Sequence, residues 1–110
     1  MDKVISIKDA IEICDNDEEF MKEMVGLMRE DLETCLQLLP KAFTGNDPIQ
    51  TREVAHRIKG QAANLAATDL WEKSKKVEDA AKVGMCTKTE YLLLILSTKE
   101  FLRCTRDKNS

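Results

Sequence analysis

The chain has 110 residues, of which 43% are hydrophobic, 34% charged and 5% aromatic, and this length is typical of one domain. Acidic residues outnumber lysine and arginine by 20 to 17, so the net charge is −3 and the basic surplus typical of nucleic-acid-binding proteins is missing. The longest apolar run, 91–96, is far shorter than the about 18 residues of a membrane span, and positions 1–10 lack the apolar stretch of a signal peptide. We therefore expect a cytoplasmic domain with neither nucleic acid nor membrane as a partner.

The cysteines and the single histidine exclude most metal and redox chemistry. No two cysteines form a CxxC pair, which excludes zinc-knuckle, thioredoxin and haem-attachment sites, and one histidine cannot form a multi-histidine metal site. We expect no metal site and no cofactor in this chain. Each cysteine lies among apolar residues at helical spacing, so we expect all of them to be reduced and packed like small hydrophobic side chains. They are Cys14, Cys35, Cys86 and Cys104.

Turn-forming residues are few, four glycines and two prolines, so long helices joined by short loops are expected. Ser6 and Asp9 have the spacing of a capping box and predict a short helix near 7–14. After a polar break, a long helix is predicted over about 18–43, and Pro40 should kink or shorten its last turn. Its apolar positions recur every three or four residues, at Phe20, Met24, Met28, Leu32, Cys35, Leu39 and Ala42.

A clear boundary separates this helix from the next one. The pair Gly45-Asn46 ends the long helix, and the pair Asp47-Pro48 follows at once. An acidic N-cap followed by proline at the first helical position is a typical helix start. The third helix should therefore begin there and reach about Ala66.

Two further helices follow. Thr68 is expected to cap a fourth helix, with Gly84 just past its end. Thr87 and Glu90 have the spacing of another capping box, which opens a last helix over about 88–103.

Short connections between long amphipathic helices favour antiparallel neighbours. We therefore predict an all-α fold, an up-down-up-down antiparallel four-helix bundle with a short extra N-terminal helix. It should form a single domain over 1–110. The tail at 105–110 should be frayed.

The only histidine, His56, is predicted to point away from the core. The apolar positions of the third helix form one stripe, and at about 100° per residue His56 lies roughly 140° from its centre. The stripe consists of Ala55, Ile58, Ala62 and Leu65.

The residues next to His56 on the outer face are all small. They are Gly60, Ala63 and Ala67, one, two and three turns further along. A solvated helix face normally carries long polar side chains, and glycine within a helix costs about 0.5–1 kcal/mol relative to alanine. This low ridge is a surface on which another protein could lie, with the imidazole standing above it.

Two cations lie on the same side of this helix as His56. Lys59 follows it by three positions, and Arg52 precedes it by four. Adjacent cations disfavour the protonated imidazole and so keep a nucleophilic nitrogen free. If that nitrogen received a phosphoryl group, Lys59 would neutralise its oxygens. The alternative at this point is an ordinary surface histidine beside solvated charges.

The segment 55–67, AHRIKGQAANLAA, resembles the signature of histidine-containing phosphotransfer (HPt) domains, and the resemblance extends from the first short helix to the last one. The H-x-x-K-G pattern is short. The Asp-Pro helix start eight residues before the histidine, the small residues after it and the long acidic helix before it make the match more specific. The resemblance implies that His56 accepts the phosphoryl group, that Lys59 steadies this group and that Gly60 opens space beside the ring.

One departure from the family pattern is visible. After leucine the family often has glycine and then alanine, whereas Ala66 and Ala67 follow Leu65 here. On the helical wheel the methyl group of Ala66 faces the bundle edge rather than His56, so we expect slightly altered helix packing and no loss of activity. Gln61 replaces a residue that is often small or carries a hydroxyl group, and its role is open.

The resemblance implies a histidine phosphotransfer protein of a two-component phosphorelay, which carries a phosphoryl group between aspartates of receiver domains. The implied partners are response-regulator receiver domains and a hybrid sensor histidine kinase, and the receiver would supply the magnesium ion. The chain has no nucleotide-binding glycine-rich loop, so it is expected to be a phosphocarrier rather than an autonomous kinase.

Two other functions remain open: a helical docking module that works without phosphorylation, and the HPt domain of a larger hybrid kinase. Apolar residues Ile7, Ile11 and Met21 are candidates for the partner surface, although ordinary core packing is the interpretation we favour for each. We expect a monomer. A patch containing Met21, Met24 and Met28 is the feature that would favour self-association instead.

Overall fold

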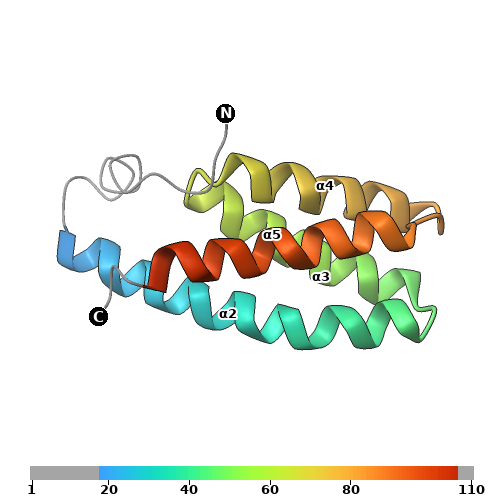
Figure 1. The fold of residues 1–110 in the computed structure, drawn as a ribbon, viewed down its shortest axis with the longest axis horizontal. Helices are drawn as coiled ribbons and strands as arrows, with labels where there is room; N and C mark the ends of the chain where they lie inside the picture. The colour runs from blue at the N-terminus through green and yellow to red at the C-terminus, as the bar shows by residue number, and fades with distance from the viewer. Residues whose placement is uncertain (1–17, 107–110) are drawn as a thin grey trace.

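The computed structural model describes residues 18–106, which form four helices and no strand (Figure 1). The helices are α2 (Glu18–Thr44), α3 (Pro48–Asn64), α4 (Thr68–Lys82) and α5 (Lys88–Arg106). The predicted all-α class is thereby confirmed for this part of the chain. The helix predicted near 7–14 lies outside the described residues, as do Ile7 and Ile11.

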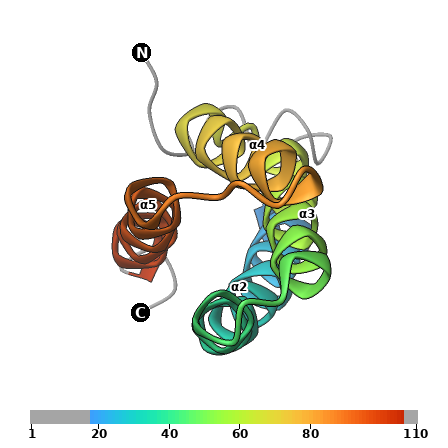
Figure 2. The ribbon, with the colours of Figure 1, turned by 90° about the vertical axis from the view of Figure 1, so that its right-hand side faces the viewer.

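The four helices lie side by side along the longest dimension of the molecule, which measures 41 × 24 × 18 Å (Figure 1). The α2–α3 and α4–α5 connections lie at one end of the bundle (Figure 2), and the α3–α4 connection lies at the other (Figure 1). Helix α3 packs most extensively against α4, whereas the packing of α2 against α5 is much less extensive.

Helices α2, α3 and α4 all end in the same way. Just past each helix a residue has a positive φ: 55° at Asn46, 56° at Ala66 and 71° at Gly84. At the end of α3 the N–H of Ala67 donates to the carbonyl of Ala62 at 2.9 Å, and the N–H of Ala66 donates to that of Ala63 at 3.3 Å. These are the two hydrogen bonds of a Schellman motif, which satisfies carbonyls that the helix leaves open.

Of the caps predicted for helix starts, three fall within the described residues, and two of these are confirmed. The Asp47 side chain accepts from the Gln50 N–H at 3.1 Å, and Thr87 and Glu90 bond reciprocally at 3.1 and 3.0 Å. The prediction for Thr68 is wrong, because the N-cap of α4 is Ala67 and no side chain caps this end. The α3 helix ends at Asn64 and reverses through the Schellman motif, which moves the N-cap to Ala67.

The core is formed by the predicted stripes with a shift at the start of α2. Met28, Leu32, Cys35, Leu39 and Ala42 are buried as predicted, but Phe20 is 49% exposed and Val25 is buried instead. The first turns of α2 extend beyond the end of α5 (Figure 1), so they have fewer helices to pack against. Helix α2 also continues past Pro40 to Thr44, so the prediction of a shortened last turn is wrong.

The last turn of α5 is held in place by α2. The Arg29 guanidinium of α2 donates to the Leu102 carbonyl at 2.5 Å and to the Thr105 hydroxyl at 2.6 Å, and Thr105 is buried. The expected fraying from Thr105 onwards is therefore wrong for Thr105 and Arg106, because α5 continues through both. Residues 107–110 lie outside the described part.

The described cysteines are free thiols in three different environments. Cys35 is buried, and burial raises the pKa of its thiol to about 11. Cys86 is half-buried, whereas Cys104 is exposed. The prediction of packed thiols is therefore correct for Cys35 and wrong for Cys104, which lies on the outer face of α5. Cys14 is outside the described residues.

Candidate functional site

Helix α3 presents His56 to solvent because its opposite face is the core. Ala55, Ile58, Ala62 and Leu65 are buried, and 66% of the His56 side chain is exposed. The predicted outward direction of the imidazole is thus confirmed. The ring remains accessible on a helix whose apolar stripe fixes its orientation.

A carboxylate of the neighbouring helix connects His56 with Lys59. Glu78 of α4 places Oε2 2.8 Å from the Nδ1 atom of His56 and Oε1 2.7 Å from the Nζ atom of Lys59. Only 13% of the Glu78 side chain is exposed, and 24% of that of Lys59. The three side chains form a cluster at the boundary between α3 and α4, with the imidazole outermost.

The charges in this cluster keep Glu78 ionised. Partial burial acts to raise the pKa of its carboxyl, but the ion pair with Lys59 and the hydrogen bond with His56 lower it more, so the pKa lies below its ordinary value. A carboxylate therefore faces the imidazole, where the sequence suggested only the cations Arg52 and Lys59.

His56 lies in a groove of about 460 Å³ along α3 and α4. Arg52 lies in the same groove, as predicted from its spacing. The residues that line the groove are Ile49, Arg52, Glu53, His56, Arg57 and Glu78. Ile49 is 69% exposed, so an apolar side chain lies beside several charged ones near the histidine.

The small ridge beside His56 is shorter than predicted. A Cβ atom added at Gly60 would have no atom within 4 Å, and Ala63 is exposed. Ala67 is buried at 1% exposure, so its predicted place on the exposed ridge is wrong. The physical reason is the end of α3 at Asn64: beyond it the chain turns, and Ala67 enters the core rather than continuing the helical face.

Comparison with known proteins decides the family. The family model of the Hpt domain matches residues 23–97, which include His56, Lys59, Gly60 and Glu78. The chain belongs to the Hpt domain family. It is a histidine phosphotransfer protein, and HPt domains act in phosphorelays with receiver domains and kinases.

A solved structure supports the same fold. The crystal structure of histidine-containing phosphotransfer protein B (HptB) from Pseudomonas aeruginosa PAO1 superposes with a TM-score of 0.84. The two sequences are 18% identical, and the match covers 96% of this chain and 93% of HptB. No sequence among the curated proteins matches this chain. At this identity the HptB structure establishes the shared fold.

Lys59 of this HPt domain is further positioned by an aromatic ring. Its Nζ atom lies 5.9 Å from the centre of the Trp71 ring on α4, within the range of a cation–π interaction. Trp71 also borders a hollow of about 180 Å³ with Ala63 and Ala66. The ammonium group is therefore held between Glu78 and Trp71, on the α4 side of His56.

Gln61, whose role the sequence left open, connects α3 with α2. Its amide donates to Oδ2 of Asp31 at 2.8 Å, and Arg57 forms an ion pair with the other carboxylate oxygen. Burial acts to raise the pKa of Asp31, but the hydrogen bonds from Gln61 and Arg57 outweigh it and lower the pKa. These contacts orient α3 relative to α2.

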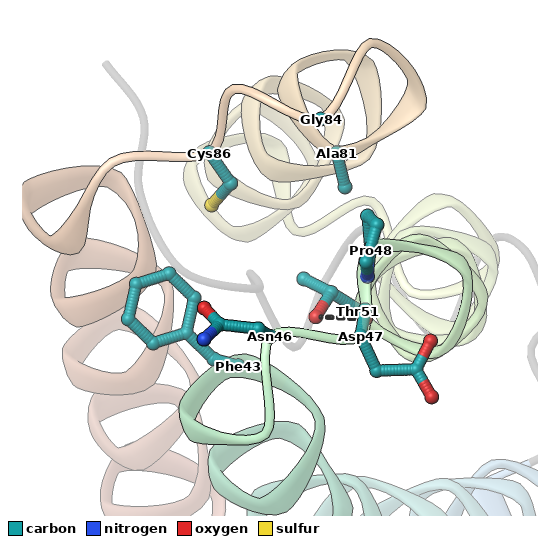
Figure 3. Close-up of a pocket in the computed structure, with 8 residues that line it drawn as sticks. All are labelled: Phe43, Asn46, Asp47, Pro48, Thr51, Ala81, Gly84 and Cys86. Carbon is teal, nitrogen blue, oxygen red and sulfur yellow. Dashed lines mark hydrogen bonds between the residues drawn. The ribbon is translucent and has the colours of Figure 1, made fainter.

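A separate pocket of about 240 Å³ lies at the end of the bundle where the α2–α3 and α4–α5 connections approach each other (Figure 3). Two of its polar groups are already paired, because the Thr51 hydroxyl donates to the Asp47 carbonyl at 2.8 Å and the Asp47 carboxylate caps α3. The Phe43 ring stacks on Tyr91 with centroids 4.2 Å apart. His56 does not line this pocket.

Two residues of the site, Glu78 and Trp71, were missed by the sequence analysis, which considered α3 alone.

Within residues 18–106, no group of three or more histidine, cysteine or acidic side chains is arranged to hold a metal ion. In the same part of the chain, no helix is long and apolar enough to cross a membrane.

Proposed function

We propose that His56 is the residue that carries the phosphoryl group. The observation that supports this most strongly is the exposed imidazole beside the Lys59 ammonium, with both side chains held by Glu78. Lys59 is the cation that would neutralise the phosphoryl oxygens, and Gly60 leaves space for an incoming group beside the ring.

The proposed step is an in-line transfer from an aspartyl phosphate of a receiver domain. A ring nitrogen of neutral His56 attacks phosphorus, the bond from phosphorus to the aspartate oxygen breaks, and its electron pair remains on the carboxylate. Return to a second receiver reverses these changes. Such a transfer requires mainly positioning and charge neutralisation, which the His56 and Lys59 pair supplies here. The magnesium ion belongs to the receiver, and this chain acts as a phosphocarrier rather than an autonomous kinase.

The proposed docking surface surrounds His56 on α3. Arg52 contributes a cation, Ile49 an exposed apolar side chain, and Gly60 and Ala63 a low surface onto which a receiver domain can close. Met21 was a further candidate, but its side chain lies outside the described set. The partners we propose are receiver domains and a hybrid sensor histidine kinase, with no nucleic acid or membrane.

We further propose the finer architecture predicted from the sequence: one domain over 1–110, with an up-down-up-down helix course and a short helix near 7–14. The alternation of the connections between the two ends of the bundle supports this course.

We propose that the protein is a monomer in the cytoplasm. Met28 is buried and Met24 packs against the core, so neither forms the exposed methionine patch that would favour self-association.

Intact mass tests the assignment of His56. The protein is incubated with a phosphorylated receiver domain and, separately, with phosphoramidate, beside a His56→Gln variant. We expect one phosphoryl adduct, labile in acid and stable in alkali, on the native protein only. An adduct of equal yield on His56→Gln contradicts the assignment. No adduct on the folded native protein with either donor favours the docking module that works without phosphorylation.

A further inference from the structure

Trp71 is the second α4 side chain, besides Glu78, that contacts Lys59. The Nζ atom of Lys59 lies over the indole ring, 5.9 Å from its centre, and 2.7 Å from Oε1 of Glu78. Trp71 and Glu78 are seven residues apart, so they share one face of α4 and are separated along it by about 10 Å. The ammonium group therefore lies in the gap between an aromatic ring and a carboxylate.

The direction of Trp71 on α4 differs from that of the core residues. The indole is half-buried and packs against the core, but it lies about 100° round the helix from Leu70, on the side of Glu78 and α3. Only 24% of the Lys59 side chain is exposed, which is little for a lysine on a helix surface. Two α4 side chains thus hold a lysine that would otherwise extend into solvent.

The neighbouring lysines of α4 are engaged elsewhere. Lys75, one turn after Trp71, forms an ion pair with Asp79 at 2.8 Å. Lys73 forms one with Asp69, also at 2.8 Å. The face of the indole is therefore left to the ammonium group that comes from α3.

We propose that Trp71 is a positioning residue that, together with Glu78, keeps the Lys59 ammonium group within reach of a phosphoryl group on His56. This inference rests on the proposed function of His56 and Lys59. A lysine side chain is flexible, and its rotamer freedom is lost when the ammonium group pairs with phosphoryl oxygens. The ring restricts this freedom before the phosphoryl group arrives. Because the ring is uncharged, it adds no second anion that would compete with the phosphoryl oxygens for the ammonium group.

The hollow beside Trp71 indicates what its removal would do. It measures about 180 Å³, and its other lining residues are Ala62, Ala63, Ala66, Ala67 and Thr68. These side chains are all small, so none of them can take the place of the indole against Lys59. In a Trp71→Leu variant the ammonium group would border a wider space, and the lysine could adopt rotamers that point away from His56.

Proton–carbon NMR tests the contact itself. Protons above an aromatic ring are shielded, so the methylene protons next to Nζ of Lys59 should resonate upfield of those of the other lysines. Trp71→Leu should abolish this shift, and Trp71→Phe, which keeps an aromatic face, should retain part of it. The signal is assigned by its loss in Lys59→Met. Absence of an upfield shift in the native protein overturns the inference.

The rate of phosphohistidine formation from phosphoramidate tests the consequence, without involving receiver docking. Trp71→Leu should lower this rate about two- to fivefold, as expected for loss of a cation–π interaction, and Trp71→Phe should keep most of it. In a Lys59→Met background Trp71→Leu should have no further effect, because no ammonium group remains to be positioned. Tyr91→Leu is the matched control, since this ring is also partly buried against the core but stacks on Phe43 instead. Its rate should equal that of the native protein.

Circular dichroism establishes that each variant is folded, and Trp71→Met replaces Trp71→Leu if the latter does not fold. If the native protein forms no phosphohistidine, the proposed function fails, and the role of Trp71 fails with it. If phosphohistidine forms and Trp71→Leu reacts as fast as the native protein, the role of Trp71 alone is refuted. An equal loss of rate in the Lys59→Met background, or in Tyr91→Leu, refutes it as well.

Discussion

Ala66 carries a backbone conformation that suits glycine better than alanine. It follows the end of α3 with φ of 56°, in the left-handed region, and completes the Schellman motif between α3 and α4. This is the position where the family pattern often has glycine. We expect the Ala66→Gly variant to be more stable than the native protein, with the site at His56 unchanged.

Two opposing effects determine the magnitude. An L-residue in the left-handed region costs about 1–2 kcal/mol, and glycine removes this strain. Glycine also makes the unfolded chain more flexible, which lowers stability by about 0.4–1 kcal/mol. The net gain in the free energy of unfolding is therefore about 0.5–1 kcal/mol. For a chain of this size that corresponds to a rise of roughly 2–6 °C in Tm.

Urea and thermal unfolding followed by circular dichroism measure this gain, with Ala63→Gly as the matched control. Ala63 is exposed and lies within the last turn of α3, so the same chemical change costs about 0.5–1 kcal/mol there. Gly84→Ala, at φ of 71°, should also lower stability. If Ala66→Gly destabilises the protein as much as Ala63→Gly does, the assignment of strain to Ala66 is refuted.

Three further variants test the site and its support. Gly60→Gln should raise the free energy of unfolding by about 0.5–1 kcal/mol, because nothing lies within 4 Å of an added Cβ. It should also slow transfer from a receiver by narrowing access to His56, so stability should rise while the transfer rate falls. Lys59→Met should lower the rate of phosphohistidine formation about tenfold while the fold is kept, and unchanged kinetics would contradict its role. Arg29→Met should reduce stability by about 1–3 kcal/mol and hydrogen-exchange protection around Thr105, since both of its hydrogen bonds to α5 are lost; protection equal to that of the native protein would refute this anchor.

The features that depend on local pattern could be predicted from the sequence. The stripe of α3 is buried and His56 exposed, because helical periodicity alone determines these directions. The caps at Asp47 and Thr87 were also predicted, since each depends on residues within three positions. The family signature around His56 and Lys59 lies within one helix, so the order of residues along the chain is enough to recognise it.

The remaining features depend on where α3 ends and what packs against it. A helix continued to Ala66 would keep Ala67 on the exposed face, but the Schellman motif turns Ala67 into the core. Glu78 was missed because it lies 22 residues after His56 and belongs to another helix. A usable signal existed: His56 and Glu78 are each eleven positions from Ala67, so a hairpin centred on this residue places them opposite each other.

The length of the turn between α3 and α4 also determines which side chains of the two helices face each other. Ala63 and Trp71 are each four positions from Ala67, and both border one hollow, which agrees with the register that places His56 opposite Glu78. One residue added to the turn would rotate every α4 side chain by about 100° and move Glu78 off the face that meets His56. The left-handed conformation at Ala66 therefore has a second effect besides ending α3. It determines which α4 residue faces the imidazole, and the α3–α4 packing, the most extensive in the bundle, maintains that alignment.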